Sequence, residues 1–479
     1  MALKNSVAKA LTAVVGRRWL RVARSELETF ASDGLPTLHS LPAAVVMPAN
    51  RAEVIGVITV LSHQSIPFVA RGAGTGLSGG ALADRDSVVI ALTRLTRIIR
   101  IDPENRTATV EPGVVNARLS QAAAQYGLHY APDPSSQTAC TIGGNIAENA
   151  GGPHCLKYGV TVNHVLELEV VLPDGEAVRL GSPSGQPWGP DLVGLFVGSE
   201  GMFGIATEIK LRLLPTPTSV IVMLADFENL HDAGATVSDI IASGIVPAAL
   251  EMLDRNCIQA VESSIYAAGY PTDVAAVLLA EVDGMSHEAV QEECKSVREI
   301  LLQGGARSVS IAEHPKHREK LWRGRKKAFG ALGRISPDLV VQDTVVPRSK
   351  LPDVLDKIAE IGASHNLSVS NVFHAGDGNL HPNINFDASD QDQCERVEKA
   401  AVEIMRTCIE AGGTITGEHG VGLDKIRYMP NIFDEDSLAA MLAVRTAFDP
   451  AELANPGKVV PTYACSEWKA SRNLRAAAR

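Results

Sequence analysis

Apolar and polar positions between residues 42 and 80 predict a strand, a helix and a second strand, in that order. Residues 44–47 are apolar, and the helix that follows begins at a capping box formed by Asn50 and Glu53. Its apolar positions recur through residues 54–61, and the helix ends before Pro67. The next apolar residues lead directly into the glycine-rich stretch 71–80. This order predicts a buried strand that carries a glycine loop at its end.

The glycine loop contains the spacing G-x-G-x-x-G from Gly74 to Gly79. In a Rossmann fold a helix opens immediately after this motif, but here residues 83–87 are mostly polar and residues 88–92 have the pattern of a strand. A Rossmann fold is therefore disfavoured. Bare backbone N–H groups in such a loop can still close on a pyrophosphate, so we predict an anion-binding loop.

Two further stretches rich in small residues, 132–152 and 195–205, interrupt a series of short elements. Small residues pack poorly as a core but let the backbone approach a large flat ligand closely. Between and around them we predict a strand at 107–111, a helix at 114–126 and a hairpin formed by 165–172 and 177–180. The Pro-Thr-Pro run at 215–217 is the clearest domain boundary in the chain.

Beyond residue 217 the pattern becomes that of an α+β domain. The predicted strands are 220–224, 276–281 and 309–312, and the predicted helices are 231–242, 286–302 and 435–448. A basic, alanine-rich tail follows Ser466, and we expect it to be loosely ordered.

Residues 371–383 predict two short extended segments joined by a Gly-Asp-Gly-Asn turn. In that register His374 faces His381 directly. Opposed side chains on antiparallel strands have Cβ atoms about 4.5–5.5 Å apart, which is close enough for two imidazoles to hold one cation. Because the pleat has a period of two, Asn383 is expected on the same face as both histidines.

A second glycine-flanked turn contains Glu418 and His419. Two histidines and a glutamate with an open position are the ligand set of a divalent-metal Lewis-acid site. For the histidine pair alone, a polar hairpin with local hydrogen bonds is the competing interpretation. The added carboxylate and imidazole favour a metal site.

Composition narrows the classes of partner. The formal net charge is −11 and no basic stripe occurs, so we expect no nucleic acid as a partner. Seven cysteines stand singly, without a Cys-x-x-Cys pair or an iron–sulfur ligand run, which indicates reduced thiols. No run of about 18 apolar residues could span a membrane. Residues 1–24 are basic and partly apolar, and we favour a surface helix over a targeting peptide there.

Several motifs carry a family resemblance that extends through residues 40–462. They are RGAGTGLSGG, PDPSSQ, IGGNIAENAGG, GSEGMFGI, HAGDGNLHP, GEHGVG and the pair FDP and NPGK. Together they resemble the FAD-dependent 2-hydroxy-acid dehydrogenases of the vanillyl-alcohol-oxidase superfamily, and within these the FAD-bearing subunits of bacterial glycolate oxidases. D-Lactate and D-2-hydroxyglutarate dehydrogenases share the motifs.

The resemblance implies an α+β fold with a PCMH-type FAD-binding domain of two subdomains and an α+β cap domain with an antiparallel sheet. The implied division is an N-terminal helical segment at 1–40, the FAD-binding domain at 41–216, a substrate- and metal-binding cap at 217–430, a C-terminal segment at 431–462 that packs back on the FAD domain, and a tail at 463–479.

The resemblance also implies roles for the candidate site residues. His419 matches the catalytic base, Arg325 the clamp of the substrate carboxylate and Asn383 a substrate contact. The implied ligands of a divalent metal, zinc or a similar ion, are His374, His381 and Glu418.

FAD is the implied cofactor. Thr75 stands where covalently flavinylated relatives carry a histidine, so we expect FAD to be held without a covalent bond. The implied FAD-binding residues are Arg71, Gly72, Ala73, Gly74, Thr75, Gly76, Leu77, Asp133, Pro134, Ser135, Ser136, Thr138, Gly143, Gly144, Glu148, Asn149, Glu200, Gly204, Ile205 and Asn455.

The implied activity is oxidation of a small 2-hydroxy acid, glycolate or D-lactate, to the 2-oxo acid by hydride transfer to flavin N5. Implied partners are iron–sulfur and second FAD-domain subunits of a glycolate oxidase complex, in the cytoplasm and at the inner membrane through those subunits. The alternatives are a D-lactate or D-2-hydroxyglutarate dehydrogenase acting alone, a non-catalytic FAD-binding subunit of a complex, and an NAD-dependent Rossmann enzyme.

Overall fold

The structure, a computed structural model, describes residues 3–35, 37–186 and 189–462. Two compact units divide the chain: the first contains Met1–Gly151, Val160–Thr216 and Glu418–Arg479, and the second contains Gly152–Gly159 and Pro217–Gly417. The change of unit at Thr216 falls within the predicted Pro-Thr-Pro boundary. The chain returns to the first unit after Gly417 instead of residue 430. The alanine-rich tail lies outside the described residues.

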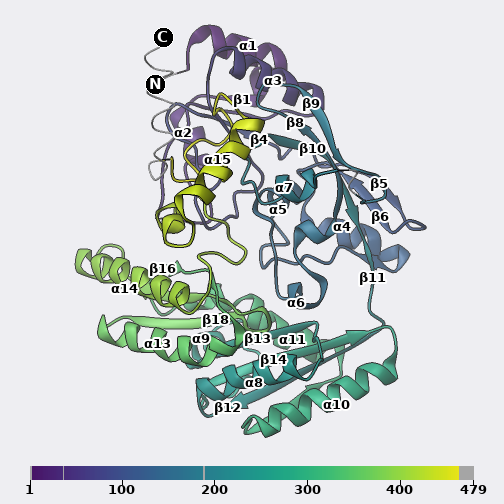
Figure 1. The fold of residues 1–479 in the computed structure, drawn as a ribbon, viewed down its shortest axis with the longest axis vertical. Helices are drawn as coiled ribbons and strands as arrows, with labels where there is room; N and C mark the ends of the chain where they lie inside the picture. The colour runs from purple at the N-terminus through teal and green to yellow at the C-terminus, as the bar shows by residue number, and fades with distance from the viewer. Residues whose placement is uncertain (1–2, 36, 187–188, 463–479) are drawn as a thin grey trace. The chain divides into compact units, whose positions relative to one another are not determined.

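One sheet of the first unit has the strand order β1–β2–β4–β3, and the last three strands run parallel. Its strands are β1 (Leu20–Arg21), β2 (Ala44–Val46), β3 (Phe68–Arg71) and β4 (Val88–Ala91). Helices α1 (Asn5–Val15) and α3 (Arg51–His63) lie beside each other and pack against it (Figure 1). As predicted, Asn50 caps α3 by accepting the N–H of Glu53 at 3.0 Å.

Helix α1 is more than the surface helix that the sequence suggested. Its residues Val7, Leu11 and Val15 are buried and belong to the core that α3 and the parallel strands share. One face of the helix is therefore part of the first unit's core.

The second sheet of this unit is antiparallel, with the order β5–β6–β10–β8–β9. Its strands are β5 (Ile98–Asp102), β6 (Thr107–Val110), β8 (Val165–Val171), β9 (Ala177–Gly181) and β10 (Ile205–Arg212), and the helices of this unit include α2 (Arg24–Leu27), α4 (Asn116–Ala123), α5 (Ile142–Glu148), α7 (Leu192–Phe196) and α15 (Glu435–Phe448). A small antiparallel pair, β7 (Leu128–His129) and β11 (Leu214–Pro215), lies beside them. The predicted hairpin is β8–β9 and the predicted C-terminal helix is α15. Helix α5 was missed, because its glycines suggested a ligand-facing loop; Thr141 caps it by accepting the N–H of Gly144 at 3.3 Å.

The second unit is built on one large antiparallel sheet with the order β15–β12–β14–β13–β18–β19–β17, to which β20 and β16 add through β18. Its strands are β12 (Ser219–Phe227), β13 (Ala249–Asp254), β14 (Ala276–Gly284), β15 (Ser308–Ala312), β16 (Asp338–Val341), β17 (Thr344–Val345), β18 (Ser368–His374), β19 (Asn379–Leu380) and β20 (Pro382–Phe386). The three strands predicted in this half correspond to β12, β14 and β15.

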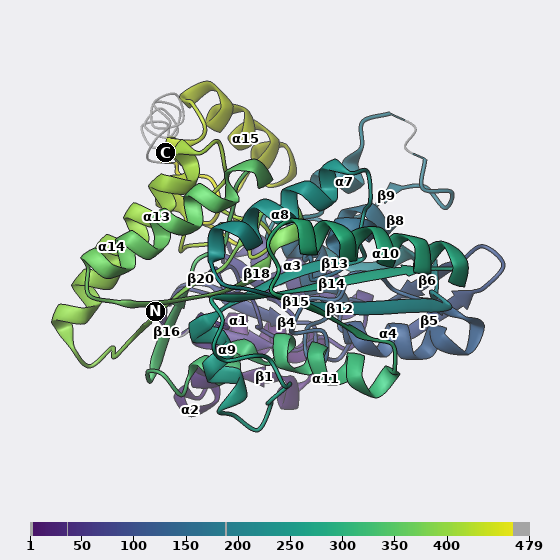
Figure 2. The ribbon, with the colours of Figure 1, turned by 90° about the horizontal axis from the view of Figure 1, so that it is seen from below.

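Helices cover both faces of this sheet. The helices are α6 (Cys155–Tyr158), α8 (Leu230–Ala242), α9 (Arg255–Glu262), α10 (His287–Gln303), α11 (Pro315–Lys326), α12 (Ala328–Leu332), α13 (Leu351–Ser364) and α14 (Gln391–Glu410). Figure 2 shows α8 and α10 on one side of the strands and α9 and α11 on the other. Alternate residues of each strand pack against opposite helical layers, as the period of two requires.

The predicted register of the histidine hairpin is wrong by two residues. His374 pairs with Asn379 and Asn371 pairs with Pro382, so the turn is Ala-Gly-Asp-Gly and His381 is diagonal to His374. Gly378 is the last residue of this turn and adopts a φ of +78°. In the predicted turn it was the third residue and Asn379 was the last. A shift of an even number of residues preserves the face, because side chains alternate with a period of two. Asn383 therefore stays on the face of both histidines.

Within the described ranges no disulfide joins the cysteines. The helices of these ranges include none with the length and apolar character needed to cross a bilayer.

Candidate active site

His374 and His381 lie side by side in the second unit. Their ring centroids are 5.2 Å apart with an interplanar angle of 82°, and both side chains are buried. His374 ends strand β18, and His381 occupies the single residue between β19 and β20. Strand pairing therefore fixes both imidazoles on rigid elements.

Glu418 and His419 directly follow Gly417, the last residue of the second unit. Ligand atoms of His374, His381 and Glu418 all lie within 4.8 Å of one another. This is the ligand set that the sequence indicated, and its donors suit zinc or a similar divalent cation.

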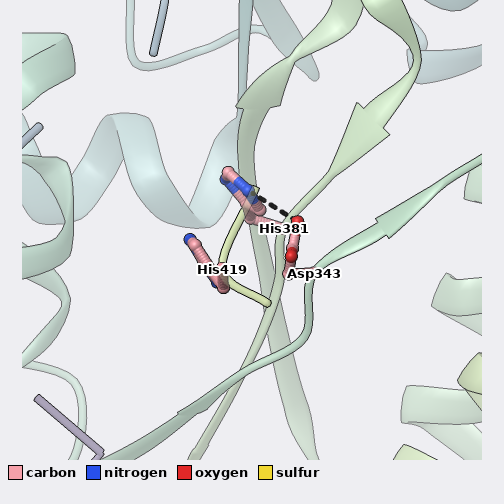
Figure 3. Close-up of side chains that lie close together, drawn as sticks. All are labelled: Asp343, His381 and His419. Atoms are coloured by element: carbon pink, nitrogen blue, oxygen red, sulfur yellow. Dashed lines mark ion pairs between the residues drawn. The ribbon is translucent and has the colours of Figure 1, made fainter. Parts of the chain in front are cut away.

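A second group of ligand atoms shares His381. Asp343, His381 and His419 also place one ligand atom each within 4.8 Å of the others, and Figure 3 shows these three side chains gathered at one place. Asp343 Oδ1 lies 3.5 Å from His381 Nε2. The other carboxylate oxygen of Asp343 accepts the hydroxyl of Thr416 at 2.6 Å and the N–H of Gly417 at 3.0 Å. Asp343 therefore fastens the chain immediately before Glu418.

Arg325 extends from α11 into the same face of the sheet and is fully buried. Its Nη2 lies 2.5 Å from Glu251 Oε2 and 3.5 Å from His374 Nδ1. Its Nε and Nη1 have no hydrogen-bond partner among the described residues. These two donors point to different sides of the guanidinium, and each can donate to an acceptor such as a ligand carboxylate, because buried N–H groups are rarely left without a partner.

Asn383 is also buried, and its amide group has a fixed orientation. The Nδ2 group donates to the carbonyls of His381 at 2.6 Å and Ser370 at 3.1 Å. A flipped amide would direct its oxygen at these two carbonyl oxygens, so the orientation follows from the hydrogen bonds. Only Oδ1 remains without a partner in the described part of the chain. Asn383 can therefore accept a hydrogen bond from a ligand but cannot donate one to a carboxylate.

The glycine loop of the first unit follows strand β3 directly. No backbone N–H of residues 73–77 donates a hydrogen bond within the described ranges, and nothing lies within 4 Å of a Cβ built on Gly76. Arg71 Nη1 and Asn145 Nδ2 are buried donors without a partner in the same ranges. Unsatisfied buried donors and a bare backbone fit the pyrophosphate of a dinucleotide such as FAD.

Two of the residues expected to contact FAD, Glu200 and Asn455, form side-chain hydrogen bonds within the first unit. Glu200 accepts the backbone N–H groups of Val421 at 2.7 Å and Gly422 at 2.8 Å. Asn455 donates to the carbonyls of Glu200 at 2.5 Å and Gly80 at 2.9 Å. In the structure these two side chains hold the segments around residues 420–422 and 455 in place within the first unit.

Burial shifts the pKa values of a buried charged cluster formed by Glu148, Glu200 and Lys458. It raises the pKa of Glu200 to about 6, although two backbone N–H groups and the charges of Lys425 and Lys458 lower it in part. Burial and then the charge of Glu200 raise the pKa of Glu148 well above its usual range. Burial also lowers the pKa of Lys458 to about 8. The cluster therefore holds fewer charges near neutrality than its composition suggests.

The raised pKa of Glu200 predicts a pH dependence of stability. Between about pH 4.5 and 6 the folded chain keeps a proton that the unfolded chain has lost, so the free energy of unfolding should fall as pH rises through this window. The shift corresponds to about 2 kcal/mol. Glu200→Gln removes this titration, so urea unfolding at the two ends of the window should show a smaller loss than in the wild type. An equal loss in both proteins would contradict the assignment.

Two residues of the site were missed from the sequence. Glu251 stands in the buried strand Ala249–Asp254, and Asp343 stands between the apolar residues 339–341 and 345–346. A charged residue among apolar, buried neighbours is rarely left unpaired, so each was a detectable signal of a polar partner.

Comparisons with known proteins identify the family of the chain. Residues 216–459 match the family of FAD linked oxidases, C-terminal domain, and residues 42–181 match the FAD binding domain. The chain is 48% identical over 446 residues to the glycolate oxidase subunit GlcD of Escherichia coli (strain K12), covering 93% of this chain and 89% of that protein. It is 35% identical to a D-lactate dehydrogenase of Anaerostipes hadrus, covering 87% of this chain and 89% of that protein.

Among solved structures, p-cresol methylhydroxylase with its substrate bound shares the fold, with a TM-score of 0.81 at 18% identity over 95% of this chain and 96% of that one. The predicted PCMH-type fold and the predicted family are therefore confirmed. A Rossmann fold is excluded by the same match. The chain belongs to the FAD-linked oxidases and is an FAD-linked oxidoreductase.

Proposed function

We propose that the protein oxidises a small 2-hydroxy acid, glycolate or D-lactate, to the corresponding 2-oxo acid. The observation that carries the proposal is the convergence of the metal-ligand set with the unsatisfied donors of Arg325 beside His374. A chelating hydroxyl and an adjacent carboxylate are the two groups that such a site would recognise together.

Each residue has a separate task in this proposal. Arg325 would hold the substrate carboxylate through one of its two unpartnered donors, Nη1 or Nε, and the buried surroundings would exclude water from that contact. His419 would take the proton of the substrate hydroxyl, since a neutral imidazole is a suitable base near neutral pH. Asn383 Oδ1 would accept a hydrogen bond from the substrate hydroxyl, the one O–H donor of these acids, before its proton passes to His419. FAD, when bound, would supply the hydride acceptor, and His374, His381 and Glu418 would hold a divalent cation that would supply Lewis acidity toward the hydroxyl.

Anaerobic mixing with a panel of 2-hydroxy acids tests the proposal. Glycolate or D-lactate should bleach the flavin absorbance near 450 nm in a rapid single-turnover phase. The chain is similar in sequence to a glycolate oxidase subunit and to a D-lactate dehydrogenase. This similarity favours glycolate and D-lactate over D-2-hydroxyglutarate as substrates. A chain that binds FAD but is bleached by none of the acids would instead be a non-catalytic FAD-binding subunit.

Removal of the cation should depress turnover strongly. A Lewis acid contributes several kcal/mol to such a step, so stripped protein should lose about 10²-fold or more of its rate of flavin reduction. Addition of Zn²⁺ should restore the rate, and flavin absorbance should show that FAD is retained throughout. Full activity in protein shown by elemental analysis to hold no metal would refute the ligand assignment.

The electrons are proposed to leave through partner subunits. The E. coli relative is named as a subunit of glycolate oxidase, which indicates an assembly of several chains. We propose that iron–sulfur and second FAD-domain subunits accept the electrons and hold this chain at the cytoplasmic side of the inner membrane. Co-purification of the tagged chain from its own cells, with iron analysis of the eluate, would test this.

A further inference from the structure

Glu251 contacts both His374, a candidate metal ligand, and Arg325, the candidate substrate-binding residue. It lies on the central strand β13, directly opposite His374 on β18, and is fully buried. Its Oε1 is 2.7 Å from His374 Nδ1, and its Oε2 is 2.5 Å from Arg325 Nη2. Glu251 therefore joins the two side chains inside the second unit of the chain, by a hydrogen bond to His374 and an ion pair with Arg325.

The contact with Glu251 determines which nitrogen of His374 carries a proton. An ionised carboxylate only accepts hydrogen bonds, so the proton must be on Nδ1. The other nitrogen, Nε2, then keeps its lone pair and is the atom that can bind a cation. An outer carboxylate that fixes the tautomer of a ligating histidine is a general feature of metal sites.

Glu251 also compensates the charge of Arg325. A guanidinium with a nitrogen only 3.5 Å from His374 Nδ1 would repel a divalent cation bound to the same imidazole. The carboxylate of Glu251 neutralises it. Stability alone does not explain the pair, because buried ion pairs contribute little net stability and this one leaves Arg325 Nε and Nη1 unsatisfied.

We propose that Glu251 is a positioning residue that prepares His374 for a cation and allows Arg325 and that cation to share one substrate. This inference rests on the proposed function, because it presumes the metal site. It predicts that loss of the Glu251 charge weakens cation binding without affecting FAD.

The test measures Zn²⁺ affinity of the metal-stripped, FAD-loaded chain by competition with a chromophoric chelator. Glu251→Gln should bind Zn²⁺ about 10- to 100-fold more weakly than the wild type. The matched control is Glu281→Gln on the neighbouring strand β14. Glu281 is likewise buried and contacts His154 Nε2 at 3.1 Å and Trp322 Nε1 at 2.6 Å, but neither is a proposed ligand. The control should bind Zn²⁺ within about twofold of the wild type, because a substitution that shares no partner with the metal site has little effect on that site.

The outcomes separate this inference from the function beneath it. Equal Zn²⁺ affinity of Glu251→Gln and wild type, with FAD retained in both, would overturn the inference and leave the proposed function intact. Equal weakening of Zn²⁺ binding in Glu251→Gln and Glu281→Gln would overturn it too. The loss of any buried carboxylate charge would then weaken binding, with no specific role for Glu251. A wild type that binds no Zn²⁺ would overturn both the metal site and the inference.

A measurement on the wild type keeps the inference testable where Glu251→Gln does not fold. In ¹⁵N-histidine-labelled, metal-stripped chain, the signals that vanish in His374→Gln report the His374 imidazole. They should show the proton on Nδ1. A proton on Nε2 would overturn the inference.

Discussion

His419→Gln is expected to slow reduction of bound FAD by 2-hydroxy acids about 10²- to 10⁴-fold, the usual contribution of a general base. The glutamine amide cannot take a proton from the substrate hydroxyl. His419 Nε2 lies 3.8 Å from Glu418 Oε1, and glutamine preserves most of the side-chain volume, so FAD should stay bound. Anaerobic stopped-flow bleaching measures the rate, and the flavin spectrum of the purified variant measures occupancy.

The matched control is His365→Gln. His365 is similarly shielded, with 17% of its side chain exposed against 14% for His419, and it too lies near a glutamate, with Nε2 3.1 Å from Glu403 Oε1. Its substitution should leave the rate of bleaching unchanged. If His419→Gln retained the rate of this control, His419 would not be the base.

The elements that the sequence predicted well are those whose pattern is local. Helix α3 was predicted from the cap formed by Asn50 and Glu53, and α15 has the bounds that the sequence predicted. Both signals are readable because caps and helical periodicity depend on neighbouring residues only. Helix α5 was not predicted, because the two glycines near its start lower its helix propensity. Its stability comes from the packing of Ile142 and Ile146 in the core.

The sequence predicted three candidate ligands that the structure brings together, but not the residues that contact them. His374, His381 and Glu418 stand in glycine-rich turns whose chemistry is readable in sequence. The hairpin register was not readable, because Ala-Gly-Asp-Gly and Gly-Asp-Gly-Asn are both acceptable turns, and only the structure shows how β19 pairs with β18 and β17. Glu251 lies 123 residues from its partner His374, so only the strand order β13–β18 reveals the pair.

Gly420→Ala should reduce the rate of flavin reduction about 10²-fold, the effect of displacing a catalytic group by about 1 Å. Gly420 follows His419 and has a φ of +85°, which costs an alanine about 1–2 kcal/mol. Its added Cβ would also lie against the carboxylates of Glu148 and Glu200, 2.8 Å from Glu200 Oε1. Glu200 cannot withdraw without releasing the N–H groups of Val421 and Gly422, so the turn that carries His419 must move.

Gly412→Ala separates the strain of the backbone from the displacement of the turn. Gly412 also has a φ of +85°, but the nearest atom to its Cβ is Pro347 Cγ at an ordinary 3.8 Å. Gly412→Ala should therefore lower thermal stability by the backbone strain alone and leave flavin reduction unchanged, while Gly420→Ala should lower both. Stopped-flow rates and thermal unfolding of the two variants measure this difference. Equal rates in the two variants would show that the packing of Gly420 against Glu200 does not position His419.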